Sequence, residues 1–192
     1  MSTYVIAGLG NPGPQYQWTR HNAGFLFLDR IAHLENVSVN RKTFSGLAGE
    51  WNFRDNRLIL LKPQTFMNLS GKSVMQALQF YKLPLSQLIV VHDELDLPYG
   101  TVRFKQGGGH GGHNGLRSIQ EQLGKGDFTR LRVGIGRPPH GDTVNYVLGN
   151  IPSDQMETLP RILDGALDMF EMMLDEGLPK AMSLFNNRNF LD

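Results

Sequence analysis

The amino-acid sequence predicts an α/β fold: a single domain with a mixed, mostly parallel twisted sheet flanked by helices on both faces. Short apolar, β-branched segments alternate with segments of helical periodicity along the chain, as is typical of such sheets. The segment Leu88–His92 (LIVVH) is apolar almost throughout, which suits a strand buried on both faces. Two strand-like segments separated by Asp55-Asn56 predict a hairpin, which makes the sheet mixed. No linker, repeat or low-complexity segment interrupts residues 1–192, so we expect one domain.

The first half of the chain contains three predicted strands and two predicted helices. A β-branched run that stops at Gly10-Asn11-Pro12-Gly13 marks the first strand, and Asp55-Asn56 separates the two strands of the hairpin. Both helices carry apolar residues at helical spacing, and the second ends before Leu83-Pro84. In order, these elements are Tyr4–Leu9, Asn22–Glu35, Gly46–Phe53, Arg57–Leu61 and Leu69–Tyr81.

The buried strand Leu88–His92 is followed by further strands and helices around a glycine-rich run. Residues 107–115 (GGGHGGHNG) contain too much glycine for a helix or a strand. A long amphipathic segment near the end has Ser153 as its expected N-cap, and Pro160 should lie early in that helix or break it. In order, the remaining elements are Val102–Lys105, Leu116–Leu123, Thr129–Ile135, Ser153–Glu176 and Pro179–Phe185.

The composition excludes several classes of protein. There are no cysteines, which excludes disulfides and thiol catalysis. No secretory leader and no membrane-length apolar stretch are present, so we expect a cytoplasmic protein that does not enter a membrane. The net charge is only +1, but residues 101–141 hold seven Lys/Arg against two acids. Such a local excess fits phosphate binding, although solvated basic faces are also common.

A histidine and an aspartate follow two different predicted strands and are candidates for catalysis. His21 comes after the first strand and its turn, and Asp93 comes directly after the buried strand Leu88–His92. A neutral imidazole can take a proton from water near pH 7, and a carboxylate can fix its tautomer and stabilise the imidazolium. A lone histidine at a helix start is more often structural. The sequence contains no Gly-x-Ser-x-Gly motif, so a His-Asp pair here would activate water itself.

Three asparagines also stand near strand ends, at Asn11, Asn68 and Asn114. In open α/β sheets, ligands bind outside the carboxyl ends of the strands, where such side chains can converge. Carboxamides can hold a carbonyl oxygen as negative charge develops on it, or bind the backbone amide of a substrate. Asparagine is also a common turn residue, so the structural and functional interpretations both remain open.

The glycine-rich run allows several interpretations. It does not match the phosphate-binding loop motif Gly-x-x-x-x-Gly-Lys-Ser/Thr, and no Rossmann pattern accompanies it. His110 and His113 are three residues apart and could bind a metal, but no further ligands with suitable spacing are evident, so we expect no metal and no cofactor. We interpret the run as a mobile flap beside the site.

Four sequence blocks resemble those of bacterial peptidyl-tRNA hydrolases, in the same order and with the same spacing. The blocks span Gly8 to Pro138, and the flanking segments are similar in length and pattern, so the resemblance covers essentially the whole chain. They are GLGNPGPQYQWTRHNAGF, KPQTFMNLSGKSV, VVHDELDLPYGTVRFKQGGGHGGHNGLRSI and FTRLRVGIGRP. The resemblance implies a monomeric cytoplasmic esterase without a metal, which hydrolyses the ester between a peptide and the 3′-terminal ribose of tRNA and so recycles the tRNA.

The resemblance also implies roles for individual residues. His21 would be the catalytic base and Asp93 would orient it. The channel for the peptide and the terminal adenosine would be lined by polar, apolar and aromatic side chains: Asn11, Tyr16, Phe66, Met67, Asn68, His113 and Asn114. Lys105 and Arg132 would hold the 5′ phosphate of the tRNA. The chain departs from the family at residues 139–146 (PHGDTVNY), which contain no Lys or Arg; this argues against tRNA binding by that loop.

The resulting hypothesis is that His21 deprotonates a water, Asn68 stabilises the oxyanion, and Asn11 and Asn114 bind peptide amides. Two other classes remain possible. The first is a non-catalytic RNA-binding module on the same fold, which would need the basic stretch but not His21 and Asp93 together. The second is a small metal-dependent amidohydrolase.

Overall fold

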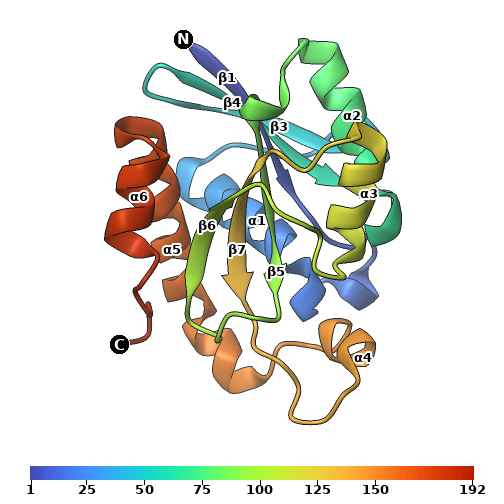
Figure 1. The fold of residues 1–192 in the computed structure, drawn as a ribbon, viewed down its shortest axis with the longest axis vertical. Helices are drawn as coiled ribbons and strands as arrows, with labels where there is room; N and C mark the ends of the chain where they lie inside the picture. The colour runs from blue at the N-terminus through green and yellow to red at the C-terminus, as the bar shows by residue number, and fades with distance from the viewer.

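The computed structural model describes residues 1–192, which fold around one seven-stranded sheet (Figure 1). The strands are β1 (Ser2–Gly8), β2 (Arg41–Thr43), β3 (Gly46–Phe53), β4 (Asn56–Pro63), β5 (Leu88–Glu94), β6 (Val102–Gln106) and β7 (Thr129–Gly134). Their order is β2-β3-β4-β1-β5-β7-β6. The four central strands β4, β1, β5 and β7 are parallel to one another. At the two sides of the sheet, β2, β3 and β6 pair antiparallel with their neighbours. The predicted mixed, mostly parallel sheet is therefore confirmed.

The helices cover both faces of this sheet, as predicted. Figure 1 shows α5 and α6 on one side of the sheet and α2 and α3 on the other, with α4 beyond the carboxyl ends of the parallel strands. The helices are α1 (Ala23–Glu35), α2 (Ser70–Tyr81), α3 (Asn114–Leu123), α4 (Thr143–Val147), α5 (Ser153–Glu176) and α6 (Leu178–Phe185). None of them combines the length and the apolar character needed to span a membrane.

Two hydrophobic clusters hold these layers together. Helices α1 and α5 pack on one face through residues such as Phe27 and Phe170, whose rings meet edge to face at 6.2 Å. Helices α2 and α3 pack on the other face through residues such as Val74 and Ile119, both fully buried. Alternate residues of the central strands supply both clusters, which explains why β5 is apolar almost throughout.

The structure adds two short elements that the sequence analysis did not predict. Strand β2 is three residues long and polar, and it exists because it pairs with the neighbouring β3. Helix α4 is only five residues long; the Asp142 side chain caps it by accepting a hydrogen bond from the backbone N–H of Asn145 at 3.1 Å. Neither segment has the length or periodicity that makes an element visible in sequence.

The long helix α5 corrects one detail of the sequence analysis. Ser153 is the first residue of the helix rather than its N-cap; Pro152 holds the cap position, and no side chain caps this end. Pro160 lies inside the helix, in its second or third turn, and does not interrupt it. Proline removes one backbone N–H, but the many buried residues on the apolar face stabilise the helix against the loss of that one bond.

Candidate active site

The predicted site residues gather where the parallel strands end. Asp93 is the penultimate residue of β5, and Asn11 lies just beyond the end of β1. His21 lies in a 3₁₀ turn, Arg20–Asn22, directly before α1. His113 caps α3, and Met67 begins the 3₁₀ turn that precedes α2. The open end of the sheet therefore brings together side chains from five separate segments, as expected for this class of fold.

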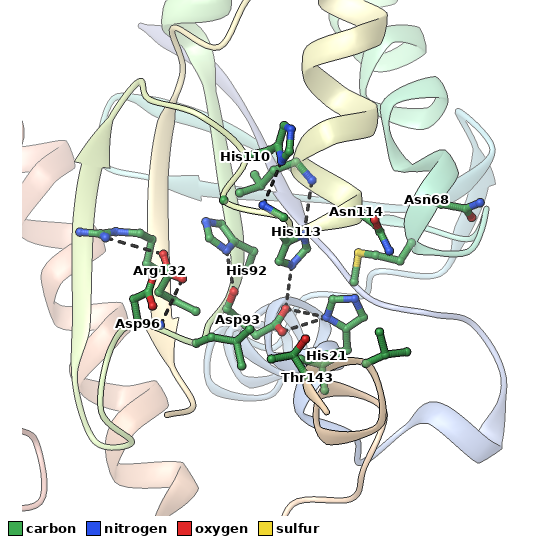
Figure 2. Close-up of a pocket in the computed structure, with 18 of the residues that line it drawn as sticks. His21, Asn68, His92, Asp93, Asp96, His110, His113, Asn114, Arg132 and Thr143 are labelled. Atoms are coloured by element: carbon green, nitrogen blue, oxygen red, sulfur yellow. Dashed lines mark hydrogen bonds and ion pairs between the residues drawn. The ribbon is translucent and has the colours of Figure 1, made fainter. Parts of the chain in front are cut away.

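Asp93 lies between two histidines and accepts hydrogen bonds from both. Nδ1 of His21 is 3.0 Å from Oδ1 of Asp93 and 2.9 Å from Oδ2. Nε2 of His113 is 2.9 Å from Oδ1 of the same carboxylate. Figure 2 shows both imidazole rings pointing toward Asp93. The carboxylate is 3% exposed, so water competes little for these bonds.

The surrounding bonds define which ring nitrogens carry hydrogen. Nδ1 of His113 accepts hydrogen bonds from the backbone N–H groups of Gly115 and Leu116, at 3.1 and 3.4 Å, so its hydrogen is on Nε2, facing Asp93. His21 must carry hydrogen on Nδ1 to donate to the carboxylate. Its Nε2, which makes no hydrogen bond within the protein, is left with a lone pair and can accept a proton in the cavity.

Burial and the neighbouring charges act in opposite directions on the pKa values of His21 and Asp93. Burial alone would lower the pKa of His21, but the attraction of Asp93 and the hydrogen bond to it outweigh burial, so the pKa is raised above its ordinary value of 6.5. Burial would raise the pKa of Asp93, but His21 and His113 hold that pKa far below its usual range. The carboxylate therefore stays ionised, and the imidazole of His21 becomes a stronger base.

Next to this group, His92 is buried and neutral. Burial lowers the pKa of His92 to about 3. Its Nδ1 lies 2.8 Å from the backbone oxygen of Asp93 and donates to it, and its ring packs edge to face against His113 at 5.1 Å. His92 therefore helps to hold the backbone of Asp93 in place. The sequence analysis had not assigned it a role.

The backbone of Asn11 is held by a second asparagine, Asn22, to which the sequence alone assigns no role. The Asn22 side chain accepts from the backbone N–H of Asn11 at 2.8 Å and donates to its backbone oxygen at 3.0 Å. Oδ1 of Asn11 accepts from the backbone N–H of Met67 at 2.7 Å. This bond assigns the amide orientation, so Asn11 directs its NH₂ group, a pair of donors, toward the cavity.

The other candidate asparagines are less constrained. The side chains of Asn68 and Asn114 are exposed and make no hydrogen bonds within the protein. Figure 2 shows Asn68 pointing away from His21 and Asp93. Both residues nevertheless line the same cavity as His21. The structure thus brings all three asparagines to one cavity but orients only Asn11.

An aromatic pair stands at the edge of the site. The rings of Tyr16 and Phe66 meet edge to face at 6.4 Å, and Phe66 is 53% exposed. Phe66 also has φ 61° and ψ 156°, a backbone conformation that costs a bulky residue about 1–3 kcal/mol. Exposed aromatic surface on a strained backbone next to the candidate base is typical of a binding site.

One cavity of about 640 Å³ joins these residues to the basic end of the sheet. It runs from His21 and Phe66 to Lys105 and Arg132. Figure 2 shows Asn68 and Arg132 on opposite sides of Asp93. Helix α4 supplies Val144 and other residues to the wall. The segment 139–146, which lacks Lys and Arg, therefore borders the cavity through Thr143 and Val144.

Four cations stand on one face of the β6–β7 pair. Arg103 pairs with Arg132 and Lys105 with Arg130, and residues directly opposite one another in a sheet project from the same face. Arg132 lies 3.7 Å from Glu94, whereas Lys105 is exposed and has no acidic partner. Lys105 and Arg132 both line the cavity and are therefore available to a ligand. Arg130 is not, because it is 2% exposed and donates to backbone oxygens of the glycine-rich run.

His21, Asp93 and His113 offer three potential ligand atoms within 4.8 Å of one another, the number found in many catalytic zinc sites. The hydrogen-bond pattern favours protons over a metal at this position. His113 carries its hydrogen on the nitrogen that faces Asp93, because its other nitrogen accepts two backbone N–H groups. His110 does not join this group; its Nδ1 accepts from the backbone N–H of Gly112.

An α/β sheet with a carboxylate-supported histidine at its carboxyl edge defines a hydrolase-type site. No serine or cysteine lines the cavity, and the hydroxyl of Thr143, which does line it, makes no hydrogen bond to His21, so the arrangement is compatible with water as the attacking group. The family model for peptidyl-tRNA hydrolase matches residues 5–191, and the chain belongs to that family. The resemblance read from the four sequence blocks is thereby confirmed.

Individual relatives agree with this assignment. The chain is 82% identical to the peptidyl-tRNA hydrolase of Pelobacter propionicus and 71% identical to that of Trichlorobacter lovleyi, with all of each chain covered in both comparisons. The crystal structure of peptidyl-tRNA hydrolase from Acinetobacter baumannii is 39% identical and superposes with a TM-score of 0.90, over 97% of this chain and 96% of that one. The similarity therefore includes the whole fold.

Proposed function

We propose that this protein hydrolyses the ester bond between the peptide and the 3′-terminal ribose of peptidyl-tRNA, and so recycles tRNA from prematurely released peptidyl-tRNA. The observation that carries the proposal is the contact of His21 with Asp93, at 2.9 and 3.0 Å, beside an open cavity. Membership of the peptidyl-tRNA hydrolase family supports the substrate.

In the proposed mechanism, Nε2 of His21 takes a proton from a water that attacks the ester carbonyl. Asp93 keeps the hydrogen of His21 on Nδ1 and stabilises the imidazolium that forms. Negative charge then develops on the carbonyl oxygen and needs a donor. Asn68 is exposed and unbonded, so its side chain is free to rotate toward that oxygen. The imidazolium finally returns its proton to the leaving ribose oxygen.

The peptide would be recognised through its backbone amides. Asn11 presents a fixed NH₂ group, and Asn114 an exposed carboxamide, to the same cavity. A buried polar group that needs a partner discriminates against a substrate without one. Aminoacyl-tRNA has a free amine where peptidyl-tRNA has an amide, so an enzyme of this design would spare it.

The tRNA would lie toward the β6–β7 end of the cavity. Lys105 and Arg132 would hold its 5′ phosphate, while Tyr16 and Phe66 would contact the 3′ end and Met67 and His113 would line the channel. We expect the enzyme to act as a monomer, as the family resemblance implies. We place it in the cytoplasm, where ribosomes produce the substrate.

Hydrolysis of purified peptidyl-tRNA tests the proposal directly. The protein should release free tRNA from peptidyl-tRNA, act much more slowly on the matching aminoacyl-tRNA, and keep its activity after exhaustive chelation. A chain that binds tRNA without cleaving it would instead be the RNA-binding module considered above. Activity lost on chelation and restored by a metal would indicate the metal-dependent amidohydrolase.

A further inference from the structure

The first half of the glycine-rich run is tied to a buried arginine. The guanidinium of Arg130 donates through Nη1 to the backbone oxygen of Gly109 and through Nη2 to that of Gly108. Nη2 also reaches the backbone oxygen of Gly126 at 3.1 Å, and the guanidinium lies 4.6 Å from the centre of the Phe128 ring. Two successive peptide groups, 108–109 and 109–110, therefore direct their carbonyls at the same buried cation.

This arrangement determines where the N–H groups of those peptides point. All peptide bonds in the chain are trans, and in a planar trans peptide the N–H is directed opposite to the C=O. Since the oxygens of Gly108 and Gly109 face Arg130, the N–H groups of Gly109 and His110 face away from it. Neither N–H has a hydrogen-bond acceptor within the protein. Two parallel donors are thus presented side by side on the outer surface of the loop.

Charge reinforces these donors. Arg130 is 2% exposed and forms no ion pair, so its direct partners are carbonyl oxygens and the face of the Phe128 ring. A cation bonded to the oxygen of a peptide polarises that peptide and strengthens its N–H as a donor. A second cation lies nearby, because a Cβ atom at Gly108 would be only 2.9 Å from Nζ of Lys105. Successive backbone N–H groups that point the same way can bind an anion.

We propose that the backbone N–H groups of Gly109 and His110 bind a phosphodiester of the RNA strand near its 3′ end, beside the Lys105 ammonium that would hold the 5′ phosphate. This inference rests on the proposed function and adds a site to it. Gly109, His110 and Lys105 line the same cavity as His21. Figure 2 shows His110 farther from His21 than His113 is, so the site suits a backbone phosphate rather than the oxyanion of the ester.

A matched pair of variants at Gly109 isolates the N–H group. A Cβ at this position would meet no atom within 4 Å, and Gly109 is not among the glycines with positive φ, so Gly109→Ala keeps both the loop and the N–H. Gly109→Pro removes the N–H. With the trinucleotide CpCpA as ligand, Gly109→Pro should bind about tenfold more weakly than Gly109→Ala, which should bind like the unaltered protein. Equal binding by the two variants would overturn the site.

A second measurement uses the unaltered protein, so its result does not depend on whether proline distorts the loop. In two-dimensional ¹H–¹⁵N NMR spectra, CpCpA should shift the amide resonances of Gly109 and His110, whereas adenosine, which has no phosphate, should leave them in place. Stationary resonances at saturating CpCpA, or equal shifts with adenosine, would contradict the proposal. Hydrolysis of peptidyl-tRNA is assayed separately, so the site can fail while the proposed activity stands.

Discussion

Nδ1 of His21 lies within 3.0 Å of both carboxylate oxygens of Asp93, although 72 residues separate the two in the chain. The contact is possible because β1 and β5 are adjacent and parallel, so the segments that follow them meet at one edge of the sheet. His113 adds a third contact to the same carboxylate. The catalytic proposal depends on this buried group.

The first prediction concerns the base. In His21→Ala, no group remains to accept the proton from water, so the turnover number on peptidyl-tRNA should fall by roughly 10²–10⁴-fold. Binding of deacylated tRNA should be unchanged, because the cations that would hold the RNA lie at the other end of the cavity. On purified protein, turnover is measured by single-turnover release of tRNA, and binding of deacylated tRNA is measured by equilibrium titration. Near-normal turnover would rule out His21 as the base.

The second prediction concerns pH. Because the pKa of His21 is raised above 6.5, kcat/KM should fall on the acid side with a midpoint above that value, as the base becomes protonated. Asp93→Asn removes the attraction that raises this pKa but leaves the burial that lowers it, so the midpoint should move to lower pH. The profile is measured between about pH 5 and pH 8. An unchanged midpoint, or one moved to higher pH, would contradict the assigned role of Asp93.

The fold could be predicted from the sequence because its strands and long helices carry strong local patterns. Strand β5 is a continuous apolar run, and α2 has apolar residues at helical spacing. Strand β2 and helix α4 could not be predicted. Strand β2 is held in place by pairing with β3, and helix α4 by the packing of its Tyr146 under Arg20. Those interactions are tertiary and leave no periodic signal.

The site was only partly predictable, for the same reason. Family motifs indicated His21, Asp93 and the asparagines, but Asn22 and Arg130 act through backbone groups that a sequence does not reveal. Arg130 looked like one more cation of the basic stretch, and only its burial shows that it organises the loop. His92 is likewise defined by its surroundings rather than by its residue type.

The third prediction separates RNA binding from chemistry. Lys105→Ala and Arg132→Ala should each weaken tRNA binding, and each lost phosphate contact should reduce the slope of log K against log salt by roughly 0.7–0.9. Cleavage of a minimal peptidyl-nucleoside, which has no 5′ phosphate end, should hardly change. Exposed Lys180, on α6 and outside the cavity, provides a control with the same charge loss, Lys180→Ala. Equal losses on both substrates would argue against the phosphate-binding role.

The fourth prediction concerns Asn22, which holds the backbone of Asn11 without lining the cavity. Asn22→Ala leaves the buried N–H and C=O of Asn11 without partners, at a cost of about 1–3 kcal/mol for each group left unsatisfied, so the free energy of unfolding should fall measurably. With its backbone released, Asn11 would hold less firmly the bond from the Met67 N–H to its Oδ1, which sets the direction of its NH₂ group. We expect kcat/KM to fall on peptidyl-tRNA, whereas the acid midpoint set by His21 and Asp93 should stay where it is.

Asn11→Ala should reproduce the kinetic loss, because it removes the donor itself. Combining the two substitutions should cost little more activity than Asn11→Ala alone. Fully additive kinetic losses in the double variant would mean that Asn22 acts on the reaction by a route other than Asn11.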